Sequence, residues 1–373
     1  MSLTRAAIPP LVLALCACSD SQTDVAAQTK AAPQAAPAGQ ASAPQPPPEL
    51  PMPVEQPAIA ASASPAAQVI DTAVFAAGVP IDKTRYSPLL VRAQVLLDRA
   101  HFSPGVIDGR DGSNMKLAII GFQQSRGLAT SGVLDEATWT ALAADGAPAM
   151  QDYTITPQDA AGPYDARSQS TDYEVLATLK QLAYASPLEA LAERFHMDEG
   201  LLKALNPGAD FAAAGTTIVV AAPGADKLGA KVAKIIVDKT LGELRALDDS
   251  GKVIAVYPAT IGSAERPAPN GEWAVRTLAP APTYTYDPSR LTFGKPTKKL
   301  TIAAGPNNPV GSTWIDLTKD TFGIHGAPDP RLIGKRASHG CVRLTNWDAA
   351  ELGSAIRKGT VVVFQGAEKT FEA

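Results

Sequence analysis

Hydrophobic residues first recur at helical spacing in the segment that follows Ser87. Serine caps a first helical turn and proline fits the first helical position, so Ser87 and Pro88 mark a helix start. Two further helices are predicted downstream, one ending near Gly127 and one capped by Asp135. The helical faces of the three segments contain Leu89, Leu90, Ala93, Leu96 and Leu97, then Leu117, Ile120, Gly121 and Phe122, then Trp139 and Leu142.

A second pair of helix starts lies between residues 152 and 223. Ser186 and Glu189 fit a capping box, and Asp198 can cap the next helix. A short apolar strand is predicted at residues 217–221. We therefore expect a small α+β module, with a helix pair flanked by strands, over residues 152–223.

Beyond residue 231 the pattern changes to the alternation of strands. "AKIIVDKTLGELRALDDSGKVIAVYPATIG" predicts two or three strands joined by tight turns. The segments "NGEWAVRTLA", "GSTWIDLT", "TFGIHGA" and "TVVVFQ" predict further strands, and one helix is expected from about Trp347 to residues 357–359. Many short strands with few helices predict a mainly-β domain, a sandwich or a barrel-like sheet, over residues 231–366.

The N-terminus has the pattern of an export signal. Arg5 precedes an apolar run at residues 6–17 that is too short to span a bilayer as a permanent anchor. The run ends in "LCAC", which resembles a bacterial lipobox whose cysteine, here Cys18, is acylated and becomes the new N-terminus. Residues 1–18 are therefore predicted to be a signal peptide with a lipobox-like end; plain secretion with cleavage near Ala17 is the alternative.

Residues 19–71 are rich in Ala, Pro, Gln and Ser and hold few large apolar side chains. A stretch such as "APQPPPELPMPVEQP" favours extended polyproline conformations and cannot build a core. We therefore expect a disordered linker at 19–71. The folded units are expected at residues 72–145, 152–223 and 231–366.

In the composition, the cysteines are the most informative residues for function. The 373 residues suffice for two or three domains, and a formal net charge of −4 offers no basic excess for a nucleic-acid partner. Once the signal is removed, Cys341 is the one cysteine besides the lipidated Cys18. It then has no partner for an internal disulfide and is either buried and inert or reactive.

Cys341 lies close in sequence to His325 and His339, and three kinds of site fit this stretch. Zinc needs three or four ligands, and the usual further partners are missing nearby. A buried thiol beside two packed histidines is also compatible. The third interpretation is a cysteine nucleophile with a histidine base. Gly340 would let backbone N–H groups face a reacting carbonyl, and Arg343 could bind a substrate carboxylate or form a structural salt bridge.

The stretch "HGAPDPRLIGKRASHGCVRL" resembles the signature of L,D-transpeptidases of the YkuD family, and within it the ErfK, YbiS, YcfS and YnhG group. "PAPNGEW", "GPNNPVGSTWIDL" and "NWDAAEL" extend the resemblance. It implies that Cys341 is the nucleophile and that His325 is the proton donor and acceptor. The other implied site residues are Gly326, whose carbonyl orients the base, Ser338, His339 and Gly340 as supporting and oxyanion groups, and Arg343 for substrate binding.

The two upstream units resemble wall-binding modules. "PGVIDGRDGSNMKLAIIGFQQSRGLATSGVLDEATWTAL" resembles the small three-helix peptidoglycan-binding domain, with Asn114 or Met115 where that family usually has threonine. The unit at 152–223 resembles a LysM-like glycan-binding module.

The resemblance implies an acyl transfer without a metal or an organic cofactor. Cys341 would attack the bond before the terminal D-alanine of a peptidoglycan tetrapeptide stem, release D-alanine and form a thioester. An amine of another stem would give a 3–3 cross-link, an envelope protein would become anchored, and a free D-amino acid would be exchanged. The implied location is the periplasm, with a lipid anchor, in the outer membrane by preference, if Cys18 is processed.

Two alternatives remain open at this point. One is a carboxypeptidase that uses the same cysteine but transfers the acyl group to water. The other is a non-catalytic peptidoglycan-binding envelope lipoprotein.

Overall fold

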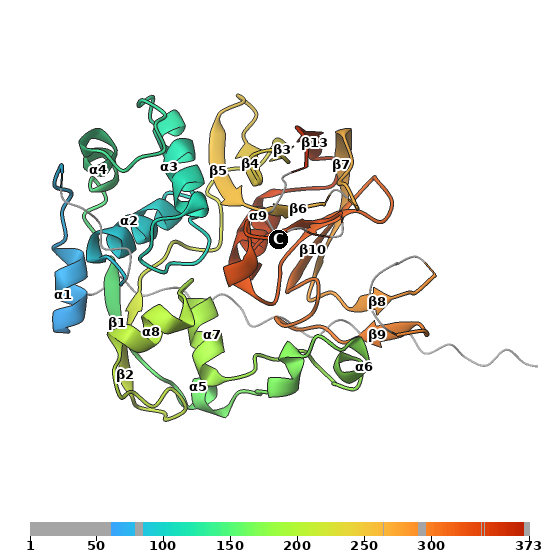
Figure 1. Ribbon diagram of the computed structural model, residues 1–373, viewed down its shortest axis with the longest axis horizontal. Helices are drawn as coiled ribbons and strands as arrows, with labels where there is room; N and C mark the ends of the chain where they lie inside the picture. The colour runs from blue at the N-terminus through green and yellow to red at the C-terminus, as the bar shows by residue number, and fades with distance from the viewer. Residues whose placement is uncertain are drawn as a thin grey trace, which may run out of the picture. The chain divides into compact units, whose positions relative to one another are not determined.

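The computed structural model describes residues 61–78, 85–263, 265–289, 296–336, 338 and 340–368 (Figure 1). The predictions for the signal peptide, for Cys18 and for most of the linker fall outside these residues, as does His339. No helix within the described ranges is long and apolar enough to cross a membrane.

The end of the expected linker is helical, so the prediction of disorder throughout 19–71 is wrong. Helix α1 (Pro65–Asp71) buries Ala67 and Ile70 fully in a core that also contains strand β1 (Met150–Thr154). Asp71 Oδ1 accepts hydrogen bonds from two backbone N–H groups at the start of β1, at 2.7 and 3.1 Å. This helix packs against residues far along the chain, and local composition therefore does not reveal it.

Three helices follow in the first expected module. The predicted starts are confirmed, since Ser87 and Asp135 each accept a hydrogen bond from a backbone N–H group of their helix. The module also contacts the C-terminal domain: Asn114 Nδ2 donates a hydrogen bond to the carbonyl of Ile333, 219 residues further along the chain, at 3.0 Å. The helices are α2 (Pro88–Arg99), α3 (Ser113–Ser125) and α4 (Glu136–Leu142).

In the second module β1 pairs antiparallel with β2 (Thr217–Ala221). All of the module's helices come between these two strands in the sequence. Ser186 and Asp198 cap two of these helices, as predicted. The segment that precedes Ser186 forms further short helices that the sequence did not indicate. The helices are α5 (Pro157–Ala161), η1 (Ala166–Gln169), α6 (Tyr173–Leu176), α7 (Pro187–Arg194) and α8 (Glu199–Leu205).

The C-terminal domain is built on a nine-stranded sheet with the order β5-β4-β3-β13-β7-β10-β11-β12-β6. Strands β5 and β6 lie at opposite ends of this order, yet only Ala259 separates them in the chain, so the sheet must curl into a near-barrel. The strands are β3 (Lys234–Asp238), β4 (Glu243–Leu247), β5 (Val253–Pro258), β6 (Thr260–Ile261), β7 (Gly271–Pro280), β10 (Thr313–Leu317), β11 (Gly323–His325), β12 (Val342–Arg343) and β13 (Val361–Gln365).

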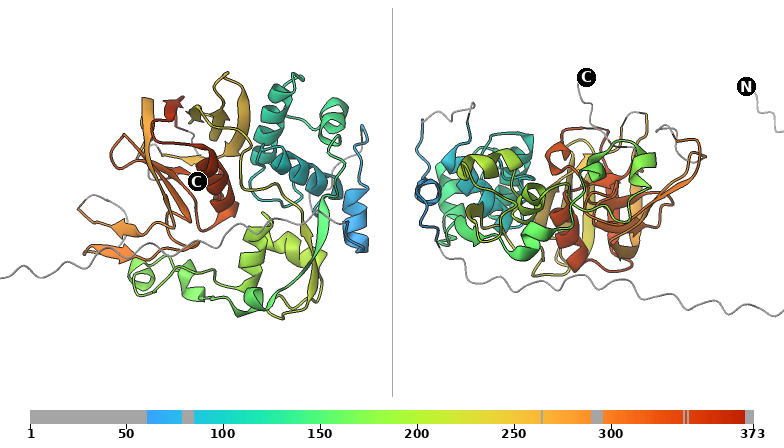
Figure 2. Two further views of the ribbon diagram at one scale, coloured as in Figure 1. Left: turned by 180° about the vertical axis from the view of Figure 1, so that it is seen from behind. Right: turned by 90° about the horizontal axis from the view of Figure 1, so that it is seen from below.

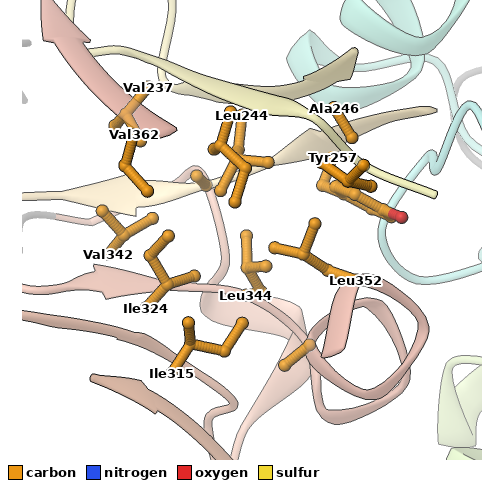
Figure 3. Packing of buried hydrophobic residues seen from close by; sticks show 14 of the residues in the cluster. Val237, Leu244, Ala246, Tyr257, Ile315, Ile324, Val342, Leu344, Leu352 and Val362 are labelled. Atoms are coloured by element: carbon orange, nitrogen blue, oxygen red, sulfur yellow. The ribbon is translucent and has the colours of Figure 1, made fainter. Parts of the chain in front are cut away.

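The inner face of the sheet packs on helix α9 (Asn346–Ala355), which Thr345 caps (Figure 3). The helix ends before the predicted 357–359. Ile356 takes an extended conformation against the core, and the carbonyl of Ala355 accepts a hydrogen bond from Val232 N–H at 3.0 Å. The core residues labelled in Figure 3 are Val237, Leu244, Ala246, Tyr257, Ile315, Ile324, Val342, Leu344, Leu352 and Val362.

A separate two-stranded ribbon projects from the domain. It consists of β8 (Tyr284–Tyr286) and β9 (Leu300–Ile302), paired antiparallel, and neither strand was predicted. Helix α6 of the second module lies beside this ribbon in both views (Figures 1 and 2).

The first module covers the edge of β5. Ser103 N–H donates to the Val256 carbonyl at 2.9 Å, and Val256 N–H donates to the His101 carbonyl at 3.0 Å. Because an open strand edge invites pairing with other chains, this contact protects the sheet as well as joining the two units.

The junction of the modules contains a buried histidine between two carboxylates. His196 Nδ1 lies 3.1 Å from Asp98 Oδ1, Nε2 lies 3.0 Å from Asp226 Oδ1, and the ring stacks on Trp347 with centroids 4.7 Å apart. Burial alone would lower the pKa of His196, but the charges of Asp98 and Asp226 outweigh it and hold the pKa well above its usual 6.5. Nearby, burial raises the pKa of Glu193 to about 8.

We expect the midpoint of urea unfolding to fall as the pH rises from about 6.5 to 8. In this window the folded chain holds protons on His196 and Glu193 that the unfolded chain releases, so each step up in pH favours unfolding. His196→Gln removes one of these protons and should flatten the dependence between pH 6.5 and 8. An equally steep fall in wild type and variant would contradict this account of the junction.

Candidate active site

The parallel pairing of β11 with β12 brings the two ends of the predicted signature together. In this register His325 lies opposite Arg343. Cys341 immediately precedes β12, and the backbone N–H of Gly323, at the start of β11, lies near enough to the thiol to favour its thiolate form. The structure therefore gathers three of the predicted site residues, His325, Cys341 and Arg343, at one point of the sheet.

Cys341 lies in a bend, and β12 contains only the two residues that follow it. Arg343 acts on the site from this strand, because its positive charge lowers the pKa values of both Cys341 and His325.

The ring of His325 is 3% exposed and is held from two sides. Nδ1 lies 2.6 Å from the carbonyl oxygen of Gly326, the contact that the family resemblance implies. Trp314, its cross-strand partner on β10, stacks against the ring with centroids 5.3 Å apart. A carbonyl oxygen only accepts hydrogen bonds, so Nδ1 carries the hydrogen and Nε2 is left with the lone pair.

His325 is neutral over the physiological range. Burial, and after it the positive charge of Arg343, lowers the pKa of the imidazole to about 3, although the Gly326 carbonyl works in the opposite direction. A neutral imidazole with a free lone pair on Nε2 is the form that a general base requires.

Asn346 packs against Gly326, the residue whose carbonyl orients His325. A Cβ atom on Gly326 would lie 2.2 Å from Asn346 Oδ1, so only glycine allows this approach. Gly326 N–H donates to the carbonyl of Thr313 at 3.1 Å, and Asn346 Oδ1 accepts from Ser312 N–H at 3.0 Å. Asn346 was not predicted as a site residue; its signal is its position in "NWDAAEL".

Ser338 and Gly340 shape the turn that leads into Cys341. Ser338 Oγ donates to the carbonyl of Cys341 at 2.6 Å and accepts from Gly340 N–H at 3.3 Å. Gly340 has φ +112°, and a Cβ atom there would lie 3.0 Å from the ring of Phe322. The turn thus requires a glycine before Cys341 for both conformational and steric reasons.

Cys341 is half-buried and rests as a neutral thiol. Burial raises the pKa of the thiol, and the Gly323 N–H and the Arg343 charge only partly oppose this. Its Sγ lies 3.9 Å from the carbonyl oxygen of Thr321. The resting pair is therefore a thiol and a neutral imidazole rather than a thiolate and an imidazolium.

A tyrosine that the sequence did not indicate belongs to the same surroundings. Burial raises the pKa of Tyr284 on β8, a thiolate at Cys341 would raise it further, and the positive charge of Arg343 lowers it, so the phenol lies within electrostatic reach of both residues. Its strand has three residues, and a single aromatic residue in so short a segment gives no functional signal.

Within the described ranges, no group of three or more His, Cys, Asp and Glu side chains is arranged to hold a metal ion. The histidine, cysteine and arginine described above suit nucleophilic acyl transfer. The thiol supplies the nucleophile, and the imidazole can take and return its proton.

Comparison with known families and proteins agrees with this chemistry. Residues 233–364 match the L,D-transpeptidase catalytic domain family (YkuD), and residues 87–142 match the family described as "Putative peptidoglycan binding domain". "Putative L,D-transpeptidase YqjB" of Bacillus subtilis is 32% identical over 143 residues, which cover 37% of this chain and 74% of that protein. "Putative L,D-transpeptidase YkuD" of Bacillus licheniformis is 28% identical over 187 residues, covering 49% of this chain and 95% of that protein.

Two further similarities cover smaller shares of the other protein. "Probable L,D-transpeptidase ErfK/SrfK" of Escherichia coli is 32% identical over 181 residues, 47% of this chain and 58% of that protein. The solved structure of an L,D-transpeptidase from Mycobacterium smegmatis is 22% identical and matches 41% of this chain and 64% of that chain, with a TM-score of 0.30.

We expect the rate of Cys341 alkylation by iodoacetamide to rise with pH towards an inflection above the ordinary thiol pKa of 9.0, without an inflection near 6.5. Arg343→Gln should move the inflection still higher, because a positive charge that favours the thiolate is lost. Mass spectrometry of the peptide that contains Cys341 follows the reaction. An inflection below pH 7 would instead indicate a resting thiolate–imidazolium pair.

Proposed function

Because this chain belongs to the L,D-transpeptidase family, we propose that Cys341 is the nucleophile with which it takes an acyl group from a peptidoglycan stem peptide. Residues 233–364 are its L,D-transpeptidase catalytic domain, and residues 87–142 its peptidoglycan-binding domain. The observation that supports the site most strongly is the β11–β12 register, with Cys341 beside Gly323 and His325 opposite Arg343.

In the first half-reaction Sγ of Cys341 attacks the carbonyl carbon before the terminal D-alanine of a tetrapeptide stem. Nε2 of His325 takes the thiol proton as the S–C bond forms, since both groups start neutral. The backbone N–H of Cys341 stabilises the oxyanion, and that of Gly340 joins it by leaving its 3.3 Å hydrogen bond to Ser338 Oγ. His325 then returns the proton to the leaving nitrogen, D-alanine departs as an amine, and a thioester remains.

In the second half-reaction an acceptor amine attacks the thioester carbonyl. His325 takes the proton of the attacking nitrogen and gives it to the departing sulfur, so the thiol is restored and one amide bond has replaced another. The acceptor is a stem-peptide amine in the cross-linking reaction. An envelope protein or a free D-amino acid can supply the same nucleophile.

Arg343 binds a carboxylate of the donor stem. Its Nε is buried and, within the part of the chain that the structure describes, has no hydrogen-bond partner. A buried unpaired donor costs free energy, and a substrate carboxylate would supply both the hydrogen bond and the opposite charge. Ser338 and His339 support the turn of Gly340 and Cys341.

The upstream modules bind peptidoglycan and so hold the catalytic domain close to its substrate. Helices α2, α3 and α4 support the three-helix form of the peptidoglycan-binding domain. In the second module, β1 and β2 with the helix pair α7 and α8 between them support a LysM-like glycan-binding unit. The N-terminal sequence supports a periplasmic enzyme with a lipid anchor on Cys18 in the outer membrane. The similarity to ErfK/SrfK and YbiS supports an enzyme of that type.

Purified protein incubated with disaccharide-tetrapeptide should release D-alanine and form dimers joined through the third residues of their stems, as judged by mass spectrometry. Cys341→Ala should abolish both products, and His325→Gln should lower the rate by roughly 10²–10⁴-fold. Tripeptide monomers without dimers would favour the carboxypeptidase. No D-alanine release by the wild type would favour the binding protein, and activity in Cys341→Ala would refute the nucleophile.

Arg343→Gln should raise the KM for the tetrapeptide donor by roughly tenfold, because a charge-assisted hydrogen bond to a carboxylate is lost. Arg276→Gln is the matched control, since Arg276 pairs with Asp316 and Asp320 at the surface. Steady-state D-alanine release measures both variants. Equal KM values for wild type and Arg343→Gln would exclude Arg343 from donor binding.

A further inference from the structure

One segment of the second module extends to the catalytic domain and packs against it. Residues 163–185, between α5 and α7, contain η1 and α6 and lie beside the β8–β9 ribbon (Figures 1 and 2). Nothing in a strand–helix–helix–strand unit requires this excursion, because the core of the module forms without it.

Backbone and side-chain contacts dock the segment firmly. Leu182 N–H donates to the Ala304 carbonyl at 2.9 Å, and Asn307 N–H donates to the Leu182 carbonyl at 3.1 Å. Asn307 Nδ2 donates to Ser168 Oγ at 3.0 Å. An apolar cluster closes the contact, formed by Leu176, Leu179 and Leu182 of the segment and Ile302 of β9.

Tyr173, the first residue of α6, packs against two tyrosines of β8. Its ring lies 5.8 Å from that of Tyr284 and 5.2 Å from that of Tyr286, centroid to centroid. The hydroxyls of Tyr173 and Tyr284 lie within hydrogen-bonding reach of each other. Tyr284 in turn lies within electrostatic reach of Cys341 and Arg343.

We propose that Tyr173 is a positioning residue for the transpeptidase reaction, through which the second module holds Tyr284 in the wall of the donor site beside Cys341 and Arg343. The proposal rests on the transpeptidase function proposed above. It makes the module part of the active site as well as a means of binding the cell wall.

The ribbon needs such support. A two-stranded β-ribbon is marginally stable by itself, and β8 and β9 form a sheet separate from the nine-stranded one. The segment supplies an apolar partner for β9, and the ring of Tyr173 packs against the rings of Tyr284 and Tyr286 on β8. Tyr284 is thereby fixed in one orientation.

The test compares Tyr173→Phe, Tyr284→Phe and the double variant in the full chain, by kcat and KM for D-alanine release from soluble disaccharide-tetrapeptide. Tyr173→Phe should lower kcat/KM about fivefold, the effect of one neutral hydrogen bond. If Tyr173 acts through Tyr284, the double variant should be no worse than Tyr284→Phe alone. The proposal would be overturned if the losses of kcat/KM in the two single variants multiplied in the double variant. It would also be overturned if kcat/KM of Tyr173→Phe stayed within about twofold of the wild-type value.

Controls separate positioning from general damage. The rate of Cys341 alkylation by iodoacetamide in Tyr173→Phe should stay within about twofold of the wild-type rate, because the substitution does not change the thiol. Tyr153→Phe is the matched control: it removes a hydroxyl that bonds Asp159 at 2.6 Å within the same module, and it should leave kcat/KM unchanged. Tyr173→Ala should be slower than Tyr173→Phe, whose ring keeps the packing.

An activity-independent measurement keeps the two claims apart. Amide hydrogen exchange over residues 284–286 should be faster in Tyr173→Ala than in wild type and unchanged in Tyr153→Phe. Unchanged exchange in Tyr173→Ala would overturn the support by Tyr173 even in an inactive enzyme. Absence of D-alanine release by the wild type would instead refute the proposed function.

Discussion

The site depends on the parallel pairing of two very short strands, β11 and β12. This pairing sets His325 opposite Arg343 and brings the Cys341 thiol to the N–H of Gly323. Parallel neighbours need a long crossover, so the chain between them has to leave the sheet and return. Asn114 of the first module bonds the Ile333 carbonyl in that crossover and helps to hold it. Burial at this point keeps the imidazole and the thiol neutral at rest.

The upstream modules contact the catalytic domain directly, at elements that surround the site. Ser103 pairs with the edge of β5, and Asn346, beside the base, bonds Glu193 of the second module at 2.8 Å. The ring of Tyr173 meets that of Tyr284. Each contact joins an upstream module to an element that carries or borders the site, so these modules and the site share one framework.

Local sequence patterns predicted much of this molecule. The caps at Ser87, Asp135 and Asp198 and most strands of the nine-stranded sheet, though not β12, follow from short-range signals, and motif resemblance singled out His325 and Cys341. Features set by distant contacts were missed. Helix α1 depends on packing against β1, the β8–β9 ribbon on its support by α6, and the roles of Asn346 and Tyr284 on the fold around them. Asn114 was noticed only as a departure from a family pattern.

The central claim is that Cys341 carries the acyl group of the stem peptide. Its most direct test is intact-mass analysis of the protein quenched in acid during turnover of a tetrapeptide donor without an acceptor amine, followed by peptide mapping. The account predicts an adduct equal to the stem fragment less D-alanine, bound through a hydroxylamine-labile thioester to the peptide that contains Cys341. An adduct on any other residue, or D-alanine release without an acylated Cys341, would contradict it.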